Sequence, residues 1–258
     1  MREATHATEP RKIALITGAS RGIGRAIALQ LAESGLRIAL HYRSNHRAAE
    51  QTLRELAGDG HALFSADLAE PNAAAQLAAD VLAHFAGRVD LLVHNAGLYL
   101  PTPMLETQNF AGWQAALREQ MQLNFIAGAE LARLLAPAMR EAGWGRIIQI
   151  ASRSGLRGEA GFAGYGASKA AQINFTKSLA AELAPDGIGC FAIAPGWVET
   201  EMSAAALAEK GERIRAEIPA GRVATPDDIA QLVAWLCTPA ADYLTGNTID
   251  VNGASYLR

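Results

Sequence analysis

The stretch Thr17-Gly18-Ala19-Ser20-Arg21-Gly22-Ile23-Gly24 joins an apolar segment of strand character to a segment with helical periodicity. Its glycines at 18, 22 and 24 let the backbone approach a bound group closely and let the following helix pack against the strand. The free amide groups at the start of that helix favour an anion. The turn therefore predicts a site for the pyrophosphate of a dinucleotide. A tight strand–helix connection without a ligand is the alternative that this stretch alone leaves open.

The rest of the chain repeats the same alternation. Short segments rich in Ile, Val and Leu predict strands at 12–17, 36–42, 60–66, 89–94, 145–151, 187–194 and 247–251. Longer segments rich in Ala, Leu, Glu and Arg predict helices near 22–34, 46–57, 71–86, 109–142, 163–184 and 226–237. This order is typical of an α/β fold, a Rossmann-type doubly wound parallel sheet of about seven strands with helices on both faces.

The alternation contains no linker, so we expect one dinucleotide-binding and catalytic domain over residues 11–258, after a polar extension over 1–10. Between Pro195 and Pro226 the alternation stops for about 30 residues, which exceeds an ordinary loop. Ligands of open parallel sheets bind at the carboxyl ends of the strands. We therefore expect residues 198–225, approximately, to form a lid over the site.

Composition excludes several classes of protein. The 258 residues carry 23 basic and 26 acidic side chains, a net charge of −3, which provides no general attraction for nucleic acid or an anionic membrane. The N-terminus lacks the apolar core of a secretory signal, and no apolar run is long enough to span a membrane. Cys190 and Cys237 are expected in the core, and no cluster of residues has the spacing of a metal site. We expect a soluble, cytoplasmic protein.

The second predicted strand indicates which dinucleotide is bound. No acidic residue occurs from Leu36 through Ala49, where an acid would hold the adenosine ribose hydroxyls of NAD(H). The strand ends instead in His41-Tyr42-Arg43-Ser44-Asn45, and Arg21 lies in the turn. Two guanidinium groups suit a 2′-phosphate, so we expect NADP(H). The alternative is that Arg43 is a solvated loop charge.

Tyr165 and Lys169 lie four residues apart in a predicted helix, and therefore on one face of it. A nearby ammonium stabilises phenolate, which would let the tyrosine exchange a proton closer to neutral pH. Such a pair on a surface helix is common, but the chain has only four lysines, Lys12, Lys169, Lys177 and Lys210. Ser152, at the end of the preceding strand, supplies a hydroxyl that can bind a carbonyl oxygen.

With these motifs, the chain from Lys12 onward resembles the short-chain dehydrogenases/reductases. The turn Thr17 to Gly24 is similar to the cofactor motif of that family, Asp67-Leu68 to its adenine contact, and Asn95-Ala96-Gly97 to the segment beside the cofactor. Ser152 lies thirteen residues before Tyr165, the usual interval of the family, and Asn124 matches its helix asparagine.

The resemblance implies a catalytic role for each of four residues. Tyr165 would protonate the carbonyl oxygen, and Ser152 would polarise that oxygen and orient the substrate. Lys169 would lower the pKa of the tyrosine and hold the nicotinamide ribose, while Asn124 would hold a water that relays protons to the lysine. Ser154 is the competing candidate for the serine role.

The resemblance also implies the cofactor-binding set. Pro195-Gly196-Trp197-Val198-Glu199-Thr200 resembles the family loop that binds the nicotinamide carboxamide and the phosphates, roles that fall to Val198 and Thr200. The full expected set is Gly18, Ser20, Arg21, Gly22, Ile23, Gly24, Arg43, Ser44, Asp67, Leu68, Asn95, Ala96, Gly97, Tyr165, Lys169, Pro195, Gly196, Val198 and Thr200.

Within the family the chain looks most like the β-ketoacyl-acyl carrier protein reductases of fatty acid biosynthesis, on the glycine turn, Gly221-Arg222-Val223 and Val251-Asn252-Gly253. The resemblance implies NADPH-dependent reduction of a 3-oxoacyl thioester by a homotetramer whose long helices, near 109–142 and 163–184, pair across a two-fold axis. Carrier-dependent relatives dock the acidic carrier protein on two arginines, but those places hold Gly143 and Asp186 here. The candidate replacements are Arg140, Arg146, Arg153 and Arg157.

Two other functions remain open from the sequence. One is a reductase or dehydrogenase of a free small ketone, polyol or cyclic alcohol that uses the same catalytic residues. The other is a protein that binds NADP(H) without turnover, for which we would expect Tyr165 or Lys169 to be missing.

Overall fold

The structure is a computed structural model that describes residues 11–105 and 110–258. The predicted polar extension over 1–10 lies outside the described residues, as does the first residue of the predicted helix 109–142.

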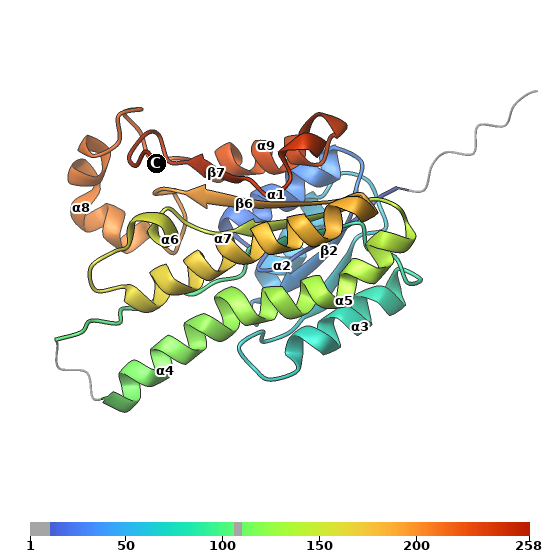
Figure 1. The fold of residues 1–258 in the computed structure, drawn as a ribbon, viewed down its shortest axis with the longest axis horizontal. Helices are drawn as coiled ribbons and strands as arrows, with labels where there is room; N and C mark the ends of the chain where they lie inside the picture. Colours follow the sequence, from blue (N-terminus) through green and yellow to red (C-terminus); the bar gives the residue numbers. More distant parts are fainter. Residues whose placement is uncertain (1–10, 106–109) are drawn as a thin grey trace, which may run out of the picture.

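Seven parallel strands form one sheet at the centre of the molecule (Figure 1). Their spatial order is β3-β2-β1-β4-β5-β6-β7, so the chain winds outward from β1 in one direction and then from β4 in the other. The predicted doubly wound sheet is confirmed, and each predicted strand ends within two residues of the observed one. The strands are β1 (Ile13–Ile16), β2 (Arg37–Tyr42), β3 (Ala62–Ser65), β4 (Leu91–His94), β5 (Gly145–Ile150), β6 (Ile188–Pro195) and β7 (Thr248–Val251).

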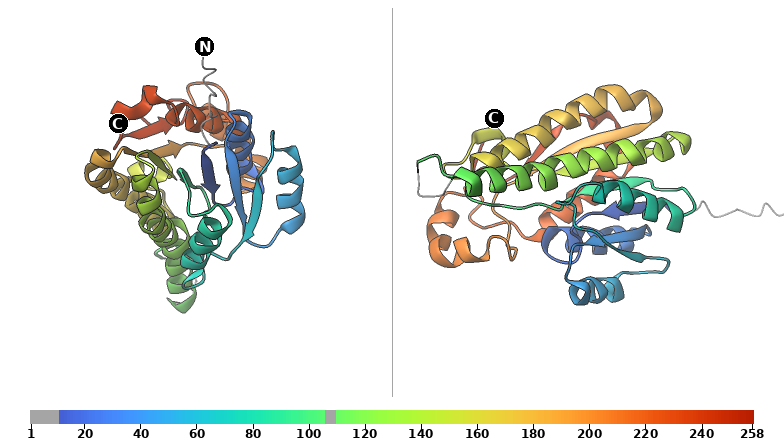
Figure 2. Two further views of the ribbon diagram at one scale, coloured as in Figure 1. Left: turned by 90° about the vertical axis from the view of Figure 1, so that its right-hand side faces the viewer. Right: turned by 90° about the horizontal axis from the view of Figure 1, so that it is seen from below.

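Helices cover both faces of the sheet (Figure 2). One layer contains α1 (Gly22–Glu33), α2 (His46–Glu55) and α9 (Pro226–Leu236). The other contains α3 (Ala73–His84), α5 (Ala127–Glu141) and α7 (Ala163–Leu183), with α4 (Phe110–Met121) packed on α7. The remaining elements are η1 (Gln122–Ile126), α6 (Ser154–Arg157), η2 (Ala184–Asp186), α8 (Ala204–Ala216) and η3 (Pro239–Leu244). No helix in the described ranges is long and apolar enough to cross a membrane.

The alternation of side chains along β1 shows how one strand serves both layers. Ala14 and Ile16 point into the core shared with α1 and α9, while Ile13 and Leu15 point into the core shared with α3 and α5. All four are buried. A strand buried on both faces reads as a continuous apolar run, which is why the sequence identified these strands well.

The structure departs from the predicted elements at two places that matter for the site. The predicted helix 109–142 is interrupted by η1, a π-helical turn that contains Asn124. The predicted lid contains a helix, α8, that the sequence analysis did not anticipate. Ile214 of α8 forms a small cluster with Ile218 and Val223, so this segment has an apolar core of its own.

A hydrogen-bond network joins β1 to β4, where the winding direction reverses. The Thr17 hydroxyl accepts from the amides of Asn95 (3.0 Å) and Ala96 (2.9 Å) and donates to Nδ1 of His94 (3.2 Å). Nε2 of His94 then donates to the carbonyls of Leu123 and Asn124 in η1, both at 3.2 Å. A neutral imidazole with its proton on Nε2 satisfies every bond, and complete burial lowers the pKa of His94 to about 3.

Gly128 of α5 makes room for that imidazole, and its replacement tests how tightly the helix packs. A Cβ at position 128 would lie 2.4 Å from Cδ2 of His94. We expect Gly128→Ala to lower the free energy of unfolding by about 1–3 kcal/mol, because the ring has no space to move. Urea denaturation measures this, with the exposed Arg133→Ala on the same helix as a control that changes stability by less than about 0.5 kcal/mol. Equal stability of the two variants would contradict the packing described here.

The neutral His94 also makes stability depend on pH. Its pKa falls from 6.5 to about 3 on folding, so the unfolded chain takes up the proton first as the pH drops. The stability that this group contributes is therefore complete above pH 6.5 and is lost toward pH 3. The loss amounts to about 1.4 kcal/mol per pH unit. We expect the free energy of unfolding of His94→Asn to depend less on pH over this range than that of the wild type. His84→Asn, at an exposed position, should follow the wild type. Parallel pH profiles for His94→Asn and wild type would show that His94 is not a buried neutral group.

Candidate active site

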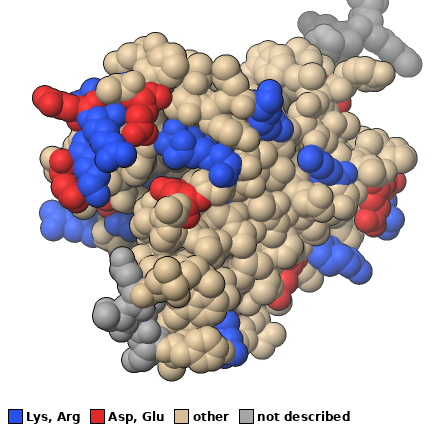
Figure 3. Space-filling view, turned by 60° about the vertical axis from the view of Figure 1, so that its left-hand side comes forward, with Lys and Arg blue, Asp and Glu red and all other residues tan. Residues whose placement is uncertain are grey.

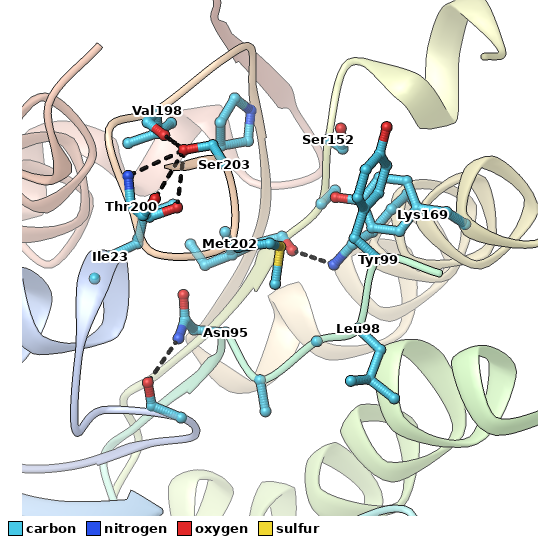
Figure 4. A pocket seen from close by; sticks show the side chains of 18 of the residues that line it. Ile23, Asn95, Leu98, Tyr99, Ser152, Lys169, Val198, Thr200, Met202 and Ser203 are labelled. Carbon is cyan, nitrogen blue, oxygen red and sulfur yellow. Dashed lines mark hydrogen bonds between the residues drawn. The ribbon is translucent and has the colours of Figure 1, made fainter. Parts of the chain in front are cut away.

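One cavity of about 330 Å³ opens at the carboxyl ends of β1, β4, β5 and β6 (Figure 4). The figure shows Ser152, Lys169 and Tyr99 at one end and Val198, Thr200 and Ser203 at the other. Most of the predicted site residues line it: Gly18, Ser20, Arg21, Gly22, Ile23, Arg43, Leu68, Asn95, Ala96, Gly97, Ser152, Tyr165, Lys169, Pro195, Gly196, Val198 and Thr200.

Four predicted site residues lie outside the cavity lining. Gly24 is behind the turn, Ser44 is exposed after β2, Asp67 accepts from the amide of Ala69 (3.1 Å), and Asn124 is fully buried. Gly24 and Asn124 still shape the site through their neighbours, as described below. Nothing in the geometry places Ser44 or Asp67 at the cavity wall, so their contact with a cofactor stays a prediction.

The glycine-rich turn is held in place by close backbone packing. Gly18 and Gly22 have positive φ angles of 65° and 52°, a region that glycine adopts without strain. A Cβ at Gly24 would lie 2.4 Å from the carbonyl oxygen of Gly18. The Asn95 side-chain amide donates to the carbonyls of Thr17 (3.0 Å) and Gly18 (3.1 Å), which fixes the turn from the β4 side.

The loop after β6 faces this turn across the cavity. A Cβ at Gly22 would lie 3.4 Å from Cγ2 of Thr200, so the loop and the start of α1 are in contact. Ser203 organises the loop, because its hydroxyl donates to the carbonyl of Val198 (2.5 Å) and accepts from the amide of Thr200 (3.1 Å). The loop therefore presents Val198 and Thr200 to the space beside the helix N-terminus.

Basic groups lie at the outer end of the turn. Arg21 and Arg43 both line the cavity and are exposed, and Arg21 forms an ion pair with Glu201 at 2.5 Å. The two guanidinium-bearing residues that the sequence associated with a 2′-phosphate thus both line one cavity. Arg21 must leave or share its Glu201 contact to bind an anion.

His41 is a cavity residue that the sequence analysis missed. Its Nδ1 accepts from the amide of Gly18 (3.1 Å) and its Nε2 donates to the carbonyl of Ala66 (3.0 Å). Burial lowers the pKa of His41 to about 4, so the ring is neutral and acts as a fixed acceptor under the turn. A histidine at the end of an apolar strand was the only available signal.

The candidate catalytic groups come from β5 and α7. Tyr165 and Lys169 lie on one face of α7, with Nζ of the lysine 5.7 Å from the centre of the tyrosine ring. Ser152 follows β5, and its hydroxyl lies close enough to the Tyr165 phenol to favour the phenolate. Lys169 is 4% exposed and donates to the carbonyl of Ile150 at 2.9 Å. The predicted serine, tyrosine and lysine are therefore gathered at one end of the cavity.

The pKa values differ from the expected pattern. Burial raises the pKa of Tyr165 to about 12, and the group that opposes this rise is Ser152 rather than Lys169. Burial also lowers the pKa of Lys169 to about 7. No contribution of Lys169 to the pKa of Tyr165 is resolved, and burial disfavours the ammonium itself, so the lowering of the tyrosine pKa by the lysine stays a prediction.

Asn124 is committed to contacts within the protein. Its side-chain amide donates to the carbonyl of Leu98 (3.0 Å) and the hydroxyl of Ser168 (2.9 Å), and its Oδ1 accepts from the amide of Leu98 (2.7 Å). These bonds fix the segment after β4 against α7, directly below the catalytic groups. Its role in a proton relay stays a prediction.

Ser154 is the weaker candidate for the catalytic serine. Its hydroxyl donates to Oε2 of Glu159 at 2.6 Å, away from Tyr165. Its amide donates to the Ser152 hydroxyl at 3.1 Å, which helps to orient that group. The geometry therefore supports Ser152 in the serine role.

A polar wall beside Tyr165 was not foreseen as part of the site. Tyr99 stacks on Phe162, with ring centres 4.1 Å apart, and meets the Tyr165 ring edge-on at 4.8 Å. The Tyr99 hydroxyl donates to Oε1 of Glu159 at 2.8 Å. Arg153 completes this wall. No spacing rule marks such residues, since a loop after β4 and a turn before α7 bring them together.

The four arginines proposed for carrier docking do not form one surface. Arg146 is 2% exposed and its guanidinium is bonded to Asp242, so its inclusion was wrong. Arg153 is also buried and belongs to the cavity, whereas Arg140 and Arg157 are exposed on separate helices. Figure 3 shows basic and acidic side chains interspersed on the face near α8. Within residues 11–105 and 110–258, no group of His, Cys, Asp or Glu side chains is arranged to hold a metal ion.

Comparison with known proteins identifies the family of the chain. The 3-oxoacyl-[acyl-carrier-protein] reductase FabG of Vibrio cholerae is 37% identical over 246 residues, covering 95% of this chain and 98% of that protein. The acetoacetyl-CoA reductase of Shinella zoogloeoides is 37% identical over 248 residues, covering 95% and 99%.

A solved structure from Beutenbergia cavernae, assigned as an NAD(P)-dependent gluconate 5-dehydrogenase with NADP bound at low occupancy, has a TM-score of 0.86. It is 37% identical, and the match covers 95% of this chain and 96% of that one. The family model described as enoyl-(acyl carrier protein) reductase, one of those for short-chain dehydrogenases, matches residues 18–254. On these matches, the chain belongs to the short-chain dehydrogenase/reductase family.

Proposed function

We propose that this protein is an NADPH-dependent carbonyl reductase that converts a 3-oxoacyl thioester into the 3-hydroxyacyl form. The observation that carries the proposal is the meeting of the Ser152 and Tyr165 hydroxyls, beside Lys169, in the cavity that the glycine-rich turn also lines. The names of the Vibrio and Shinella relatives support the substrate class.

The chain's own donors fit NADP(H). The start of α1 supplies amide groups for a pyrophosphate, the lack of side chains at the turn lets that group approach, and Arg21 and Arg43 suit an added 2′-phosphate. The Beutenbergia neighbour, with NADP bound, supports the same choice. Val198 would contact the nicotinamide carboxamide and Thr200 the cofactor phosphates. When bound, the reduced cofactor supplies a hydride to the carbonyl carbon.

Two hydroxyls then act on the carbonyl oxygen. Ser152 donates a hydrogen bond that polarises the C=O bond and fixes its direction. Tyr165 transfers its phenolic proton to the oxygen as negative charge develops there, which gives the alcohol. A pKa near 12 suits the tyrosine to remain protonated until that moment. Lys169, next to it, is placed to favour the phenolate that remains, and Asn124 would hold the water that returns a proton.

The resemblance to β-ketoacyl-acyl carrier protein reductases also suggests the substrate carrier and the assembly of this protein. We propose an acyl thioester, on carrier protein or CoA, as the substrate and a homotetramer as the assembly, in the cytoplasm. If carrier protein docks, the exposed Arg140 and Arg157 remain the candidate contacts.

A second function is favoured by the polar wall of the cavity. Tyr99, Arg153 and Glu159 suit a small polar substrate better than a long alkyl chain. The gluconate 5-dehydrogenase assignment of the Beutenbergia neighbour points to the same class. Reduction or oxidation of a free, polar small molecule is therefore the alternative to thioester reduction.

The two exposed arginines predict a preference between cofactors. We expect kcat/KM for NADPH to exceed that for NADH by about 100-fold, and Arg43→Ala to reduce this ratio by about 10-fold through KM for NADPH, since one charged contact to the 2′-phosphate is lost. Steady-state kinetics with both cofactors measure it, with the exposed Arg47→Ala on α2 as a control. Equal efficiency with NADH would eliminate the phosphate site.

The reaction itself is tested with two thioesters. We expect NADPH oxidation with acetoacetyl-CoA but not with crotonyl-CoA, which offers a C=C bond in place of the 3-oxo group. Tyr165→Phe should lose about 1,000-fold or more in kcat because the proton donor is removed, while NADPH binding, followed by fluorescence, is unchanged. Activity only on crotonyl-CoA, or full turnover by the phenylalanine variant, would contradict the proposal.

A further inference from the structure

Among residues 11–105 and 110–258, two arginines are buried, and they differ in how many of their donors are used. Arg146 is 2% exposed, and each of its three side-chain nitrogens has an acceptor. Nε donates to the carbonyl of Leu236 (3.0 Å), Nη1 to that of Gly145 (2.9 Å), and Nη2 to the carboxylate of Asp242. This is the usual condition of a buried guanidinium, because an unpaired charge away from water is costly.

Arg153 is buried to a similar extent, at 5% exposure, but is poorly satisfied. Its Nη1 donates to the hydroxyl of Ser255. Among the described residues no carboxylate forms an ion pair with it, and its Nε and Nη2 have no protein acceptor. A charge-bearing fork with free donors therefore lines the cavity.

The backbone places Arg153 beside the reacting groups. It directly follows Ser152, and its amide donates to the carbonyl of Pro195 (3.0 Å), which ties it to the ends of β5 and β6. It lines the same cavity as Ser152 and Tyr165. A group bound by its guanidinium would therefore occupy the same cavity as a carbonyl held by Ser152.

The two carboxylates whose charges act on Arg153 already bind other groups. Glu159 accepts from the hydroxyls of Tyr99 (2.8 Å) and Ser154 (2.6 Å), and Glu217 is paired with Arg213 at 3.4 Å. The positive charge of Arg157 acts on the same guanidinium, so with these two carboxylates the surroundings of Arg153 carry no excess of positive charge that would stabilise a doubly charged phosphate. A single negative charge in a planar group matches both this field and the shape of the guanidinium.

We propose that Arg153 binds a carboxylate carried by the substrate itself, a few bonds from the reacting carbonyl, so that free oxo acids are substrates of this site. A 3-oxoacyl thioester has no charge at that position, since the phosphates of CoA or carrier protein lie at the far end of the pantetheine arm. The inference rests on the proposed NADPH-dependent carbonyl reduction and adds free oxo acids to the substrates of that reaction.

Pairs of substrates that differ only in charge test this. Acetoacetate and 5-oxohexanoate are each compared with their methyl esters in NADPH oxidation. We expect the wild type to have a higher kcat/KM for at least one of the two acids than for its methyl ester. For that acid, Arg153→Met should lower kcat/KM by about 30-fold or more relative to the ester. Arg153→Lys keeps the charge without the fork and should retain part of the preference. The exposed Arg215→Met on α8 serves as the matched control and should leave the preference unchanged.

Binding provides a readout that does not need turnover. Isothermal titration of the same acids into NADP⁺-saturated protein should show binding by the wild type and the Arg215→Met variant and its loss in Arg153→Met. Preference for the esters throughout, or an acid-to-ester ratio that Arg153→Met does not change, overturns the inference. If no carbonyl compound is reduced, acetoacetyl-CoA included, the proposed reaction fails, and the titration alone then decides whether Arg153 binds a carboxylate.

Discussion

The hydroxyl of Thr17 is the point on which the site depends. It accepts from the amides of Asn95 and Ala96 and donates to His94, and so joins the ends of β1 and β4 at the place where the winding of the sheet reverses. Through His94 the same network reaches η1 and Asn124, and through Asn95 it fixes the glycine-rich turn. The Thr17 side chain thus fixes the glycine-rich turn relative to the segment that contains Asn124.

Burial then determines which side chains around the cavity carry a charge. His41 and His94 are kept neutral, so they act as fixed hydrogen-bond partners rather than as charges. Tyr165 is held in its protonated form, and Lys169 is brought to a pKa near neutral pH. A tyrosine that holds its proton and a lysine that exchanges protons readily are suited to reduction of a carbonyl followed by recovery of the proton from solvent. Arg153 brings a positive charge to the wall of the cavity beside Tyr165, where it can bind a negatively charged group of the substrate.

The sequence predicted the parts of this protein that local chemistry determines. Strands buried on both faces are continuous apolar runs, and the glycine turn and the Tyr165–Lys169 spacing are fixed by neighbouring residues, so both were found. The π-helical turn at Asn124 and the helix α8 were not, because each depends on packing against distant segments. The inward position of Arg146 was likewise invisible, since its partners Leu236 and Asp242 lie about 90 residues further along the chain. Side chains such as Tyr99 and Glu159 meet only after the loops fold together.

We propose that the cavity brings a reduced nicotinamide and a carbonyl together between the glycine turn and Tyr165. This is tested by mass spectrometry of the alcohol formed from NADPH that is deuterated at nicotinamide C4. We expect one deuterium on the former carbonyl carbon, from one of the two C4-deuterated diastereomers only, and none from deuterated solvent at that carbon. An alcohol that carries no label from either diastereomer would contradict direct hydride transfer in this site.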